Sequence, residues 1–175
     1  MKKLLFSIAI VAAGLLVASC GSKPEVKKEL AGQKIETEQL SFVMPEGWKE
    51  IPTGADKSCI KKIRKGEGKI DDMKQFGVSI VTDNGPHPVT DPAERRDKLV
   101  ENNHYVSQGD TILGGKQYFI AYKADTYMTV LFAKLKDGSD QLLKLTAEYS
   151  TDMKDQELLD IIDNITIKYT QQKIK

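Results

Sequence analysis

Apolar and polar residues alternate most regularly over residues 141–149. Leu143, Leu145, Ala147 and Tyr149 alternate there with lysine, threonine and glutamate. A period of two residues is typical of a β-strand that buries one face and exposes the other. We therefore predict a strand here, in an antiparallel sheet with one side against the core.

Further strands are predicted where short runs rich in β-branched and aromatic residues are bounded by turn-forming residues. These runs cover residues 40–44, 48–51, 59–65, 76–82, 105–113, 117–124, 126–135 and 165–169. Gly114-Gly115 predicts a hairpin because glycine readily adopts positive φ. A tight turn is expected at Asp125, and Asp137-Gly138 opens the next one. The second half of the chain is thus predicted to be a meander of consecutive antiparallel strands.

A first helix is predicted after the loop of residues 83–90. Asp91 is a suitable N-cap, Pro92 suits the first helical position, and Glu94 is placed to reach back in a capping box. We expect this helix to end at about Asn102.

A second helix is predicted near the C-terminus, with Thr151 or Asp152 as its cap and Asn164 at its end. Its apolar positions include Leu158 and Ile162. Strands in antiparallel order together with two helices predict an α+β sandwich.

The N-terminus has the pattern of an export signal. Lys2 and Lys3 precede an uncharged, mostly apolar run of 14 residues, 4–17, which is shorter than the ~20 residues needed to span a bilayer as a helix. Val17-Ala18-Ser19-Cys20 then matches the lipobox of bacterial lipoproteins. We predict cleavage between Ser19 and Cys20 and lipidation of the Cys20 thiol. The alternative is an uncleaved membrane anchor with an incidental cysteine.

These signals predict four parts of the chain. They are a signal peptide (1–19), a lipidated cysteine with a flexible tether (20–36), a folded domain (37–170) and a polar tail (171–175). Two or three acyl chains give stable membrane attachment. Gly21 rather than aspartate follows the cysteine, which in enteric bacteria is typical of an outer-membrane address. We expect a lipid-anchored protein of the bacterial cell envelope, at the outer membrane.

Composition and charge exclude some partners. The precursor has 26 basic and 25 acidic side chains, and loss of Lys2 and Lys3 leaves 24 against 25. A nearly neutral chain has no general attraction to nucleic acid. With Cys20 lipidated, Cys59 is the one remaining thiol of the two cysteines, so no intramolecular disulfide is expected.

Few residues suggest chemistry. His87 could form a metal site with Asp83 and Asp91, but a solvated loop histidine explains it equally simply and is favoured because the usual ligand spacing is missing. His104 lies at a helix end, where a positive charge suits the helix dipole. Residues 66–69, Gly-Glu-Gly-Lys, lack the spacing of a phosphate loop and favour a hairpin tip.

Cys59 lies near several lysines that would lower the pKa of a reactive thiol. We favour a half-buried strand residue, because no resolving cysteine accompanies it. The nearby cations form the one local charge bias, and we expect them on an exposed sheet edge, where lysines oppose aggregation; a contact with an anionic partner or lipid headgroups is the alternative. They are Lys57, Lys61, Lys62, Arg64, Lys65 and Lys69.

Aromatic residues on consecutive strands are expected to form core and cross-strand pairs, although an exposed subset would mark a docking face. They are Tyr118, Phe119, Tyr122, Tyr127 and Phe132. No Ser-His-Asp order and no nucleophile elbow is present in the sequence. Asp71 and Asp72 are neighbours in a predicted loop, and adjacent carboxylates are weak evidence for catalysis by a pair of acids.

Several features together resemble the PsbP-like (DcrB-like) superfamily. They are the segment Phe42-Val43-Met44-Pro45-Glu46-Gly47-Trp48, the mid-chain helix, the meander and the closing segment 157–165. The resemblance covers about residues 38–170. It implies an α/β/α sandwich around an antiparallel sheet and non-enzymatic roles in docking to a larger complex or supporting its assembly. Pro45 and Gly47 would form a tight hairpin that folds Trp48 onto the core.

Taken together, these observations favour a non-catalytic binding or assembly module, anchored through Cys20 and docking to an envelope protein, with no cofactor. The alternative is an enzyme, or a carrier of a small ligand or metal, with a site near His87 and Asp91.

Overall fold

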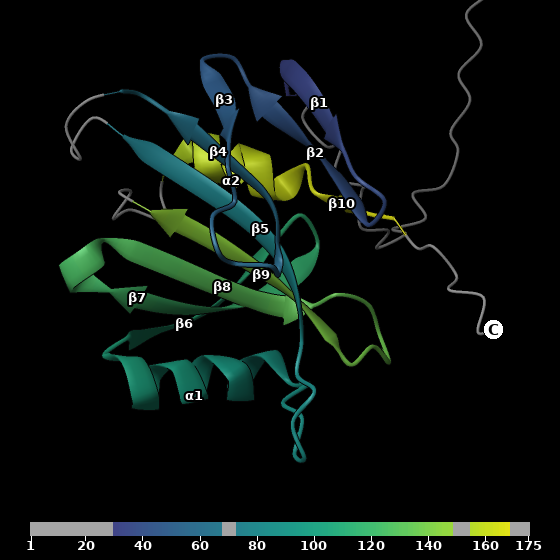
Figure 1. Ribbon diagram of the computed structural model, residues 1–175, viewed down its shortest axis with the longest axis vertical. Helices are drawn as coiled ribbons and strands as arrows, with labels where there is room; N and C mark the ends of the chain where they lie inside the picture. The colour runs from purple at the N-terminus through teal and green to yellow at the C-terminus, as the bar shows by residue number, and fades with distance from the viewer. Residues whose placement is uncertain (1–29, 68–72, 149–154, 169–175) are drawn as a thin grey trace, which may run out of the picture.

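The computed structural model describes residues 30–67, 73–148 and 155–168, and Figure 1 shows their arrangement. Two antiparallel sheets and two helices are present in these ranges. The smaller sheet has the order β1 (Gly32–Glu36), β2 (Leu40–Pro45), β10 (Thr166–Ile167). The predicted α+β class is therefore confirmed.

The larger sheet has seven strands, all in antiparallel pairs. Their order is β3 (Trp48–Ile51), β4 (Cys59–Lys65), β5 (Lys74–Thr82), β9 (Gln141–Glu148), β8 (Met128–Lys134), β7 (Lys116–Lys123), β6 (Val106–Leu113). The last four lie in consecutive order, so the predicted meander is confirmed. Gly114 and Gly115 both have positive φ in the β6–β7 turn, as predicted. A 3-10 turn, Ala124–Thr126, joins β7 to β8 at the expected position.

The core lies on one face of the seven-stranded sheet. Leu143, Leu145 and Ala147 of β9 are at most 1% exposed, which confirms the alternation expected for this strand. The small sheet and helix α2 (Gln156–Asp163) pack against this face, with Leu158 and Ile161 among the buried residues. We call this side of the sheet the core face and the opposite side the outer face.

Helix α1 (Pro92–Asn103) contacts β6, β7 and β8. The register places Ala121, Val130 and Phe132 on the outer face, opposite in pleat to the core residues. Arg96 stacks over the Phe119 ring at 5.6 Å from its centroid, which fixes α1 over β7. The layers are thus α1, the large sheet, and α2 beside the small sheet, as the α/β/α prediction required (Figure 1).

The predicted tether is too long at its C-terminal end. Residues 32–36 form β1, which pairs with β2 over five residues from Gly32↔Pro45 to Glu36↔Ser41. Ile35 is 3% exposed and belongs to the core. The sequence here is mostly polar, and it becomes a strand because β2 supplies the hydrogen-bonding edge. Residues 32–36 therefore belong to the folded domain rather than to the tether.

The turn at Pro45-Glu46-Gly47 is also different from the expected hairpin. The strands on its two sides, β2 and β3, belong to different sheets. Gly47 has φ +82°, and Trp48 is 5% exposed against the core, as predicted. The turn passes the chain from the small sheet to the large one instead of pairing two neighbours.

The helix ends agree with the predictions in part. Asp91 accepts hydrogen bonds from the N–H groups of Ala93 and Glu94 at 2.9 and 3.0 Å. The Glu94 carboxylate pairs with Lys98 at 3.3 Å rather than completing a capping box. Helix α1 runs one residue past the expected end, and His104 follows it in the left-handed conformation.

The second helix begins at Gln156 with Asp155 as its cap, and ends at Asn164 as expected. Asp155 accepts from the Glu157 N–H at 3.1 Å. The predicted caps Thr151 and Asp152 lie outside the described residues. Among the described residues the last strand is Thr166–Ile167, which pairs with β2; Tyr169, the predicted end, lies outside them.

Candidate functional site

Helix α1 covers only half of the outer face. It contacts β6, β7 and β8, while the outer-face residues of β5 and β9 continue beyond it. Ser79 and Val81 of β5 lie next to Lys144 and Leu142 of β9 in the register. The step between the helix and this uncovered half of the sheet forms a groove.

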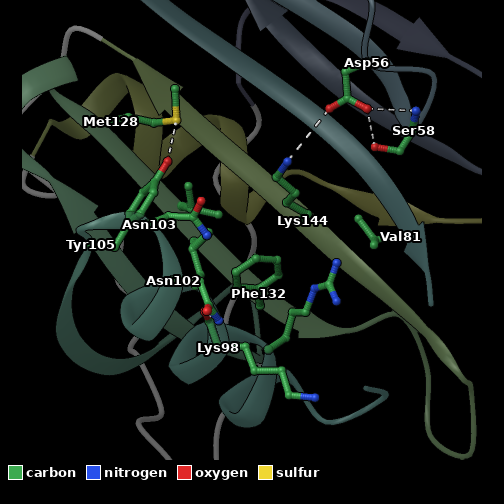
Figure 2. A pocket seen from close by; sticks show the side chains of 13 residues that line it. Asp56, Ser58, Val81, Lys98, Asn102, Asn103, Tyr105, Met128, Phe132 and Lys144 are labelled. Carbon is green, nitrogen blue, oxygen red and sulfur yellow. Dashed lines mark hydrogen bonds and ion pairs between the residues drawn. The ribbon is translucent and has the colours of Figure 1, made fainter. Parts of the chain in front are cut away.

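The groove has a volume of about 480 Å³, within the range of ~300–1,000 Å³ typical of small-molecule sites. Figure 2 shows Phe132 near its centre, with Lys144 on one side and Lys98 and Asn102 of α1 on the other. Its lining combines α1, the sheet and the 56–58 loop: Asp56, Ser58, Val81, Arg95, Lys98, Leu99, Asn102, Asn103, Tyr105, Met128, Val130, Phe132 and Lys144.

One side of α1 supplies a wall of the groove. Its lining positions are 95, 98, 99, 102 and 103, a spacing of three and four residues that places them on one helix face. Pro92 is the only residue of α1 that is fully buried. The helix therefore turns a largely polar stripe, with Leu99 as its apolar member, toward the groove.

Lys144 and Asp56 form the opposite wall. Their charged groups are 3.8 Å apart, and the Lys144 side chain is 27% exposed. Asp56 accepts hydrogen bonds from the Ser58 N–H at 2.9 Å and the Ser58 hydroxyl at 2.5 Å. These bonds, led by the hydroxyl, hold the pKa of Asp56 below its usual value, with a further contribution from Lys144. Asp56 is thus held as an anion mainly by its own turn, and Lys144 is bound only loosely to it.

Arg95 brings a second cation to the groove. It lies 3.1 Å from the Asp83 carboxylate, and its side chain is 33% exposed. Asp83 also accepts from the N–H groups of Gly85 and Val89. These backbone donors are the main reason that the pKa of Asp83 is lowered, with Arg95 adding to the effect. The ion pair fastens the 83–91 loop to the side of α1.

Tyr105 and Met128 close one end of the groove. The Tyr105 hydroxyl donates to the Met128 sulfur at 3.2 Å (Figure 2). Burial raises the pKa of Tyr105, so its hydroxyl stays protonated at neutral pH. This end offers a polarisable and weakly polar surface rather than a charged one.

The predicted histidine site is not assembled. His87 is exposed, the Asp91 carboxylate caps α1, and the Asp83 carboxylate is engaged by Gly85, Val89 and Arg95. Within residues 30–67, 73–148 and 155–168, no three His, Cys, Asp or Glu side chains are grouped so as to hold a metal ion. The groove lies on the same side of the sheet as this loop, but no histidine lines it.

Cys59 is a half-buried strand residue, as the sequence favoured. Burial raises the pKa of its thiol, and Ser79 and the nearby lysines only partly oppose that effect. The lysines therefore do not bring the pKa of this thiol below its usual value. The Sγ atom lies 3.4 Å from the Lys61 carbonyl oxygen, which it can approach as a donor.

The lysines around β4 are not on a sheet edge. Strand β4 lies between β3 and β5, and three of its lysines pair with glutamates: Lys61 with Glu50 at 2.5 Å, Lys62 with Glu148 at 2.8 Å and Lys65 with Glu157 at 2.5 Å. For the four cations on β4 the edge prediction is therefore wrong, because β3 adds outside β4. The ion pairs tie β4 to β3, β9 and α2 and neutralise the local charge.

The aromatic residues singled out in the sequence are mostly buried. Tyr118 and Phe132 are 2% exposed, Phe119 and Tyr122 are partly buried, and Tyr127 is 48% exposed at the β7–β8 turn. Gly68, Lys69 and Asp71-Asp72 lie outside the described residues. No helix among the described residues is long and apolar enough to cross a membrane.

This arrangement of layers defines a PsbP-like α+β fold. The solution structure of cyanobacterial PsbP (CyanoP) from Synechocystis sp. PCC 6803 is similar, with a TM-score of 0.51 and 14% identity over 85% of this chain and 99% of that one. The predicted fold resemblance is thereby confirmed.

A second similar structure is a crystal structure of a protein from Bacteroides thetaiotaomicron VPI-5482, with a TM-score of 0.51 and 14% identity over 79% of this chain. The similarity covers 49% of that protein, so this chain spans about half its length. No family model matches the sequence, and no curated protein matches it either. At these identities the similarities establish the fold alone.

Apart from Phe132, which was expected as a core or cross-strand aromatic residue, the groove residues are those that sequence reasoning missed. They come from five separate segments, and none belongs to a motif with fixed spacing. The signal that could have drawn attention to them is the composition of α1, whose residues 95–103 contain few apolar side chains for a helix packed on a sheet.

Proposed function

We propose that this protein is a lipid-anchored lipoprotein of the bacterial cell envelope, held at the outer membrane through Cys20. Its PsbP-like domain is a non-catalytic binding or assembly module that meets an envelope partner. The observation that carries the anchor is the lipobox Val17-Ala18-Ser19-Cys20, directly after a 14-residue apolar run. The first described strand begins at Gly32, so 11 residues, 21–31, separate it from Cys20 and can span at most ~40 Å.

The character of the groove supports a binding role. It is lined by apolar side chains, amides and charged groups, with neither a histidine nor a cysteine among them. Its one serine, Ser58, donates its hydroxyl to Asp56 within a turn. This set of residues suits recognition of a ligand through apolar contact, hydrogen bonds and charge.

The anchor is tested by feeding cells an alkyne-bearing fatty acid and detecting lipid on the tagged full-length chain. We expect label on the wild-type chain and no label on Cys20→Ser. The matched control is Cys59→Ser, which removes the other cysteine and should keep the label. Label that persists on Cys20→Ser, or a wild-type chain without label, would contradict the anchor.

The assembly role is tested separately. Wild-type cells are crosslinked and the tagged chain is purified for mass spectrometry. A module that docks to a neighbour should recover the same envelope protein in independent preparations, and the Cys20→Ser chain should recover less of it because it is no longer held at the membrane. Recovery of no reproducible partner would overturn this part of the proposal.

A further inference from the structure

The groove joins an apolar floor to walls that carry three cations and one carboxylate: Arg95, Lys98, Lys144 and Asp56. Phe132 and Val130 are 2% and 1% exposed and form the base under α1. Val81 and Leu99 are half-buried and give the floor its accessible apolar surface. A small ion would leave the apolar floor exposed to water, and a purely apolar ligand would make no interaction with the cations. The groove therefore suits a ligand with both an apolar part and an anionic group.

The cations are placed to receive an anion. Lys144 lies 3.8 Å from Asp56, beyond hydrogen-bond length, so the ammonium keeps its donors available. Arg95 binds Asp83 through one terminal nitrogen, and a guanidinium carries five donors. Both side chains are about two-thirds buried or more, where an ion pair is screened less than on the open surface.

We propose that the groove binds an amphiphilic carboxylate, such as a medium-chain fatty acid or a similar acyl chain with one anionic head. The chain would lie over Phe132, Val81 and Leu99, and the carboxylate would face Lys144 and Arg95. The choice of ligand rests on the proposed function, because a domain anchored to a membrane lies close to lipid acyl chains. The volume of about 480 Å³ admits a single short chain.

The test uses a photoreactive, diazirine-bearing dodecanoate added to envelope membranes that contain the full-length chain. After illumination, the labelled peptides are mapped by mass spectrometry. We expect adducts on residues 95–103 of α1 and 128–132 of β8. The methyl ester of the probe, which lacks the charge, should label these segments about tenfold less, because it makes no charge-assisted hydrogen bond.

Substitutions sharpen the assignment. Lys144→Gln removes the central cation and should lower labelling of the groove about tenfold. Lys34→Gln is the control, because Lys34 is on β1 with a side chain 65% exposed and lies outside the groove. Asn102→Trp fills the groove from an exposed helix position, so the fold is retained while labelling should decrease. Equal labelling in wild type, Lys144→Gln and Asn102→Trp would overturn the proposal.

Competition identifies the source of the ligand. Suppression of labelling by free decanoate supports a free fatty acid, whereas suppression only by phosphatidylglycerol vesicles, whose anionic group is a phosphodiester, would overturn the proposed carboxylate. Adducts found only outside the groove would overturn the proposal. A photoreactive amino acid placed at position 102 gives a second test, and crosslinks from it to protein alone would also overturn the proposal.

The same labelling is repeated on the Cys20→Ser chain. If the groove is labelled but wild-type Cys20 carries no lipid, the anchor is refuted and the ligand proposal is supported. If Cys20 carries lipid but the groove is not labelled, the anchor is supported and the ligand proposal is refuted.

Discussion

The two faces of strand β9 have different surroundings and different roles. On the core face, Leu143, Leu145 and Ala147 are at most 1% exposed. On the outer face, Lys144 borders the groove and Glu148 pairs with Lys62 at 2.8 Å. The core face meets α2 and the small sheet, whereas the outer face is only half covered by α1. The core face of β9 therefore contributes most to stability, whereas the outer face around Lys144 is available for binding.

Substitution on the two faces should separate these contributions most strongly. Leu145→Ala removes a side chain that is 0% exposed and should lower the free energy of unfolding by about 2–5 kcal/mol. Lys144→Gln, one residue earlier, should change it by less than about 1 kcal/mol. Urea denaturation of both variants measures the difference. Similar losses for the two would contradict the assignment of faces.

The packing of β5 on β9 gives the next largest effect. A Cβ atom on Gly77 would lie 2.5 Å from Thr146 Oγ1, so Gly77→Ala should cost about 1–3 kcal/mol through overpacking. Adding Thr146→Ala removes that oxygen and should restore part of the loss. The two single variants and the double variant, compared by denaturation, test the register. An effect in the double variant equal to the sum of the single effects would show that the two residues do not meet.

The coverage of the outer face depends on the cap of α1. Asp91→Ala removes the acceptor for the Ala93 and Glu94 N–H groups and should destabilise by about 1 kcal/mol. Asp91→Asn is the matched control, because asparagine caps equally well. Hydrogen exchange should become faster in α1 and stay unchanged in β9. Equal protection of α1 in all three proteins would argue against this cap.

The smallest effect concerns pH and the 83–91 loop. The pKa of Asp83 is lowered from 3.8, chiefly by the Gly85 and Val89 N–H groups. A lowered pKa in the folded state means that the stabilisation is present above the unfolded pKa and is lost as pH falls through the folded one. The amide resonances of Gly85 and Val89 should therefore titrate with a midpoint below 3.8. Asp83→Asn should abolish that titration, and a midpoint above 3.8 would reverse the sign.

Local patterns predicted much of this fold because the responsible interactions are local. The alternation in β9, the cap at Asp91 and the glycine pair at Gly114 each act within a few residues. Strand β1 escaped prediction because only Ile35 is buried in it and its hydrogen bonds depend on β2. The position of β4 inside the sheet likewise follows from the addition of β3, which no property of β4 itself reveals.

The groove could not be predicted from spacing because it arises where a helix covers only part of a sheet. The sequence pattern predicts Lys144 as an exposed strand residue and Arg95 as a helix residue, and nothing in the pattern relates the two. They line one groove only once β9 lies next to β8 and α1 crosses β7. The anchor differs in kind, because the lipobox is contiguous and is recognised as sequence.

The central claim is that Cys20 is the lipid-bearing first residue of the mature protein. The most direct measurement is the intact mass and N-terminal peptide of the chain extracted from membranes. The account predicts a chain that starts at Cys20, lacks residues 1–19 and carries a diacylglyceryl group on the thiol. A mature chain that starts at Met1, or one with an unmodified Cys20 thiol, would contradict it.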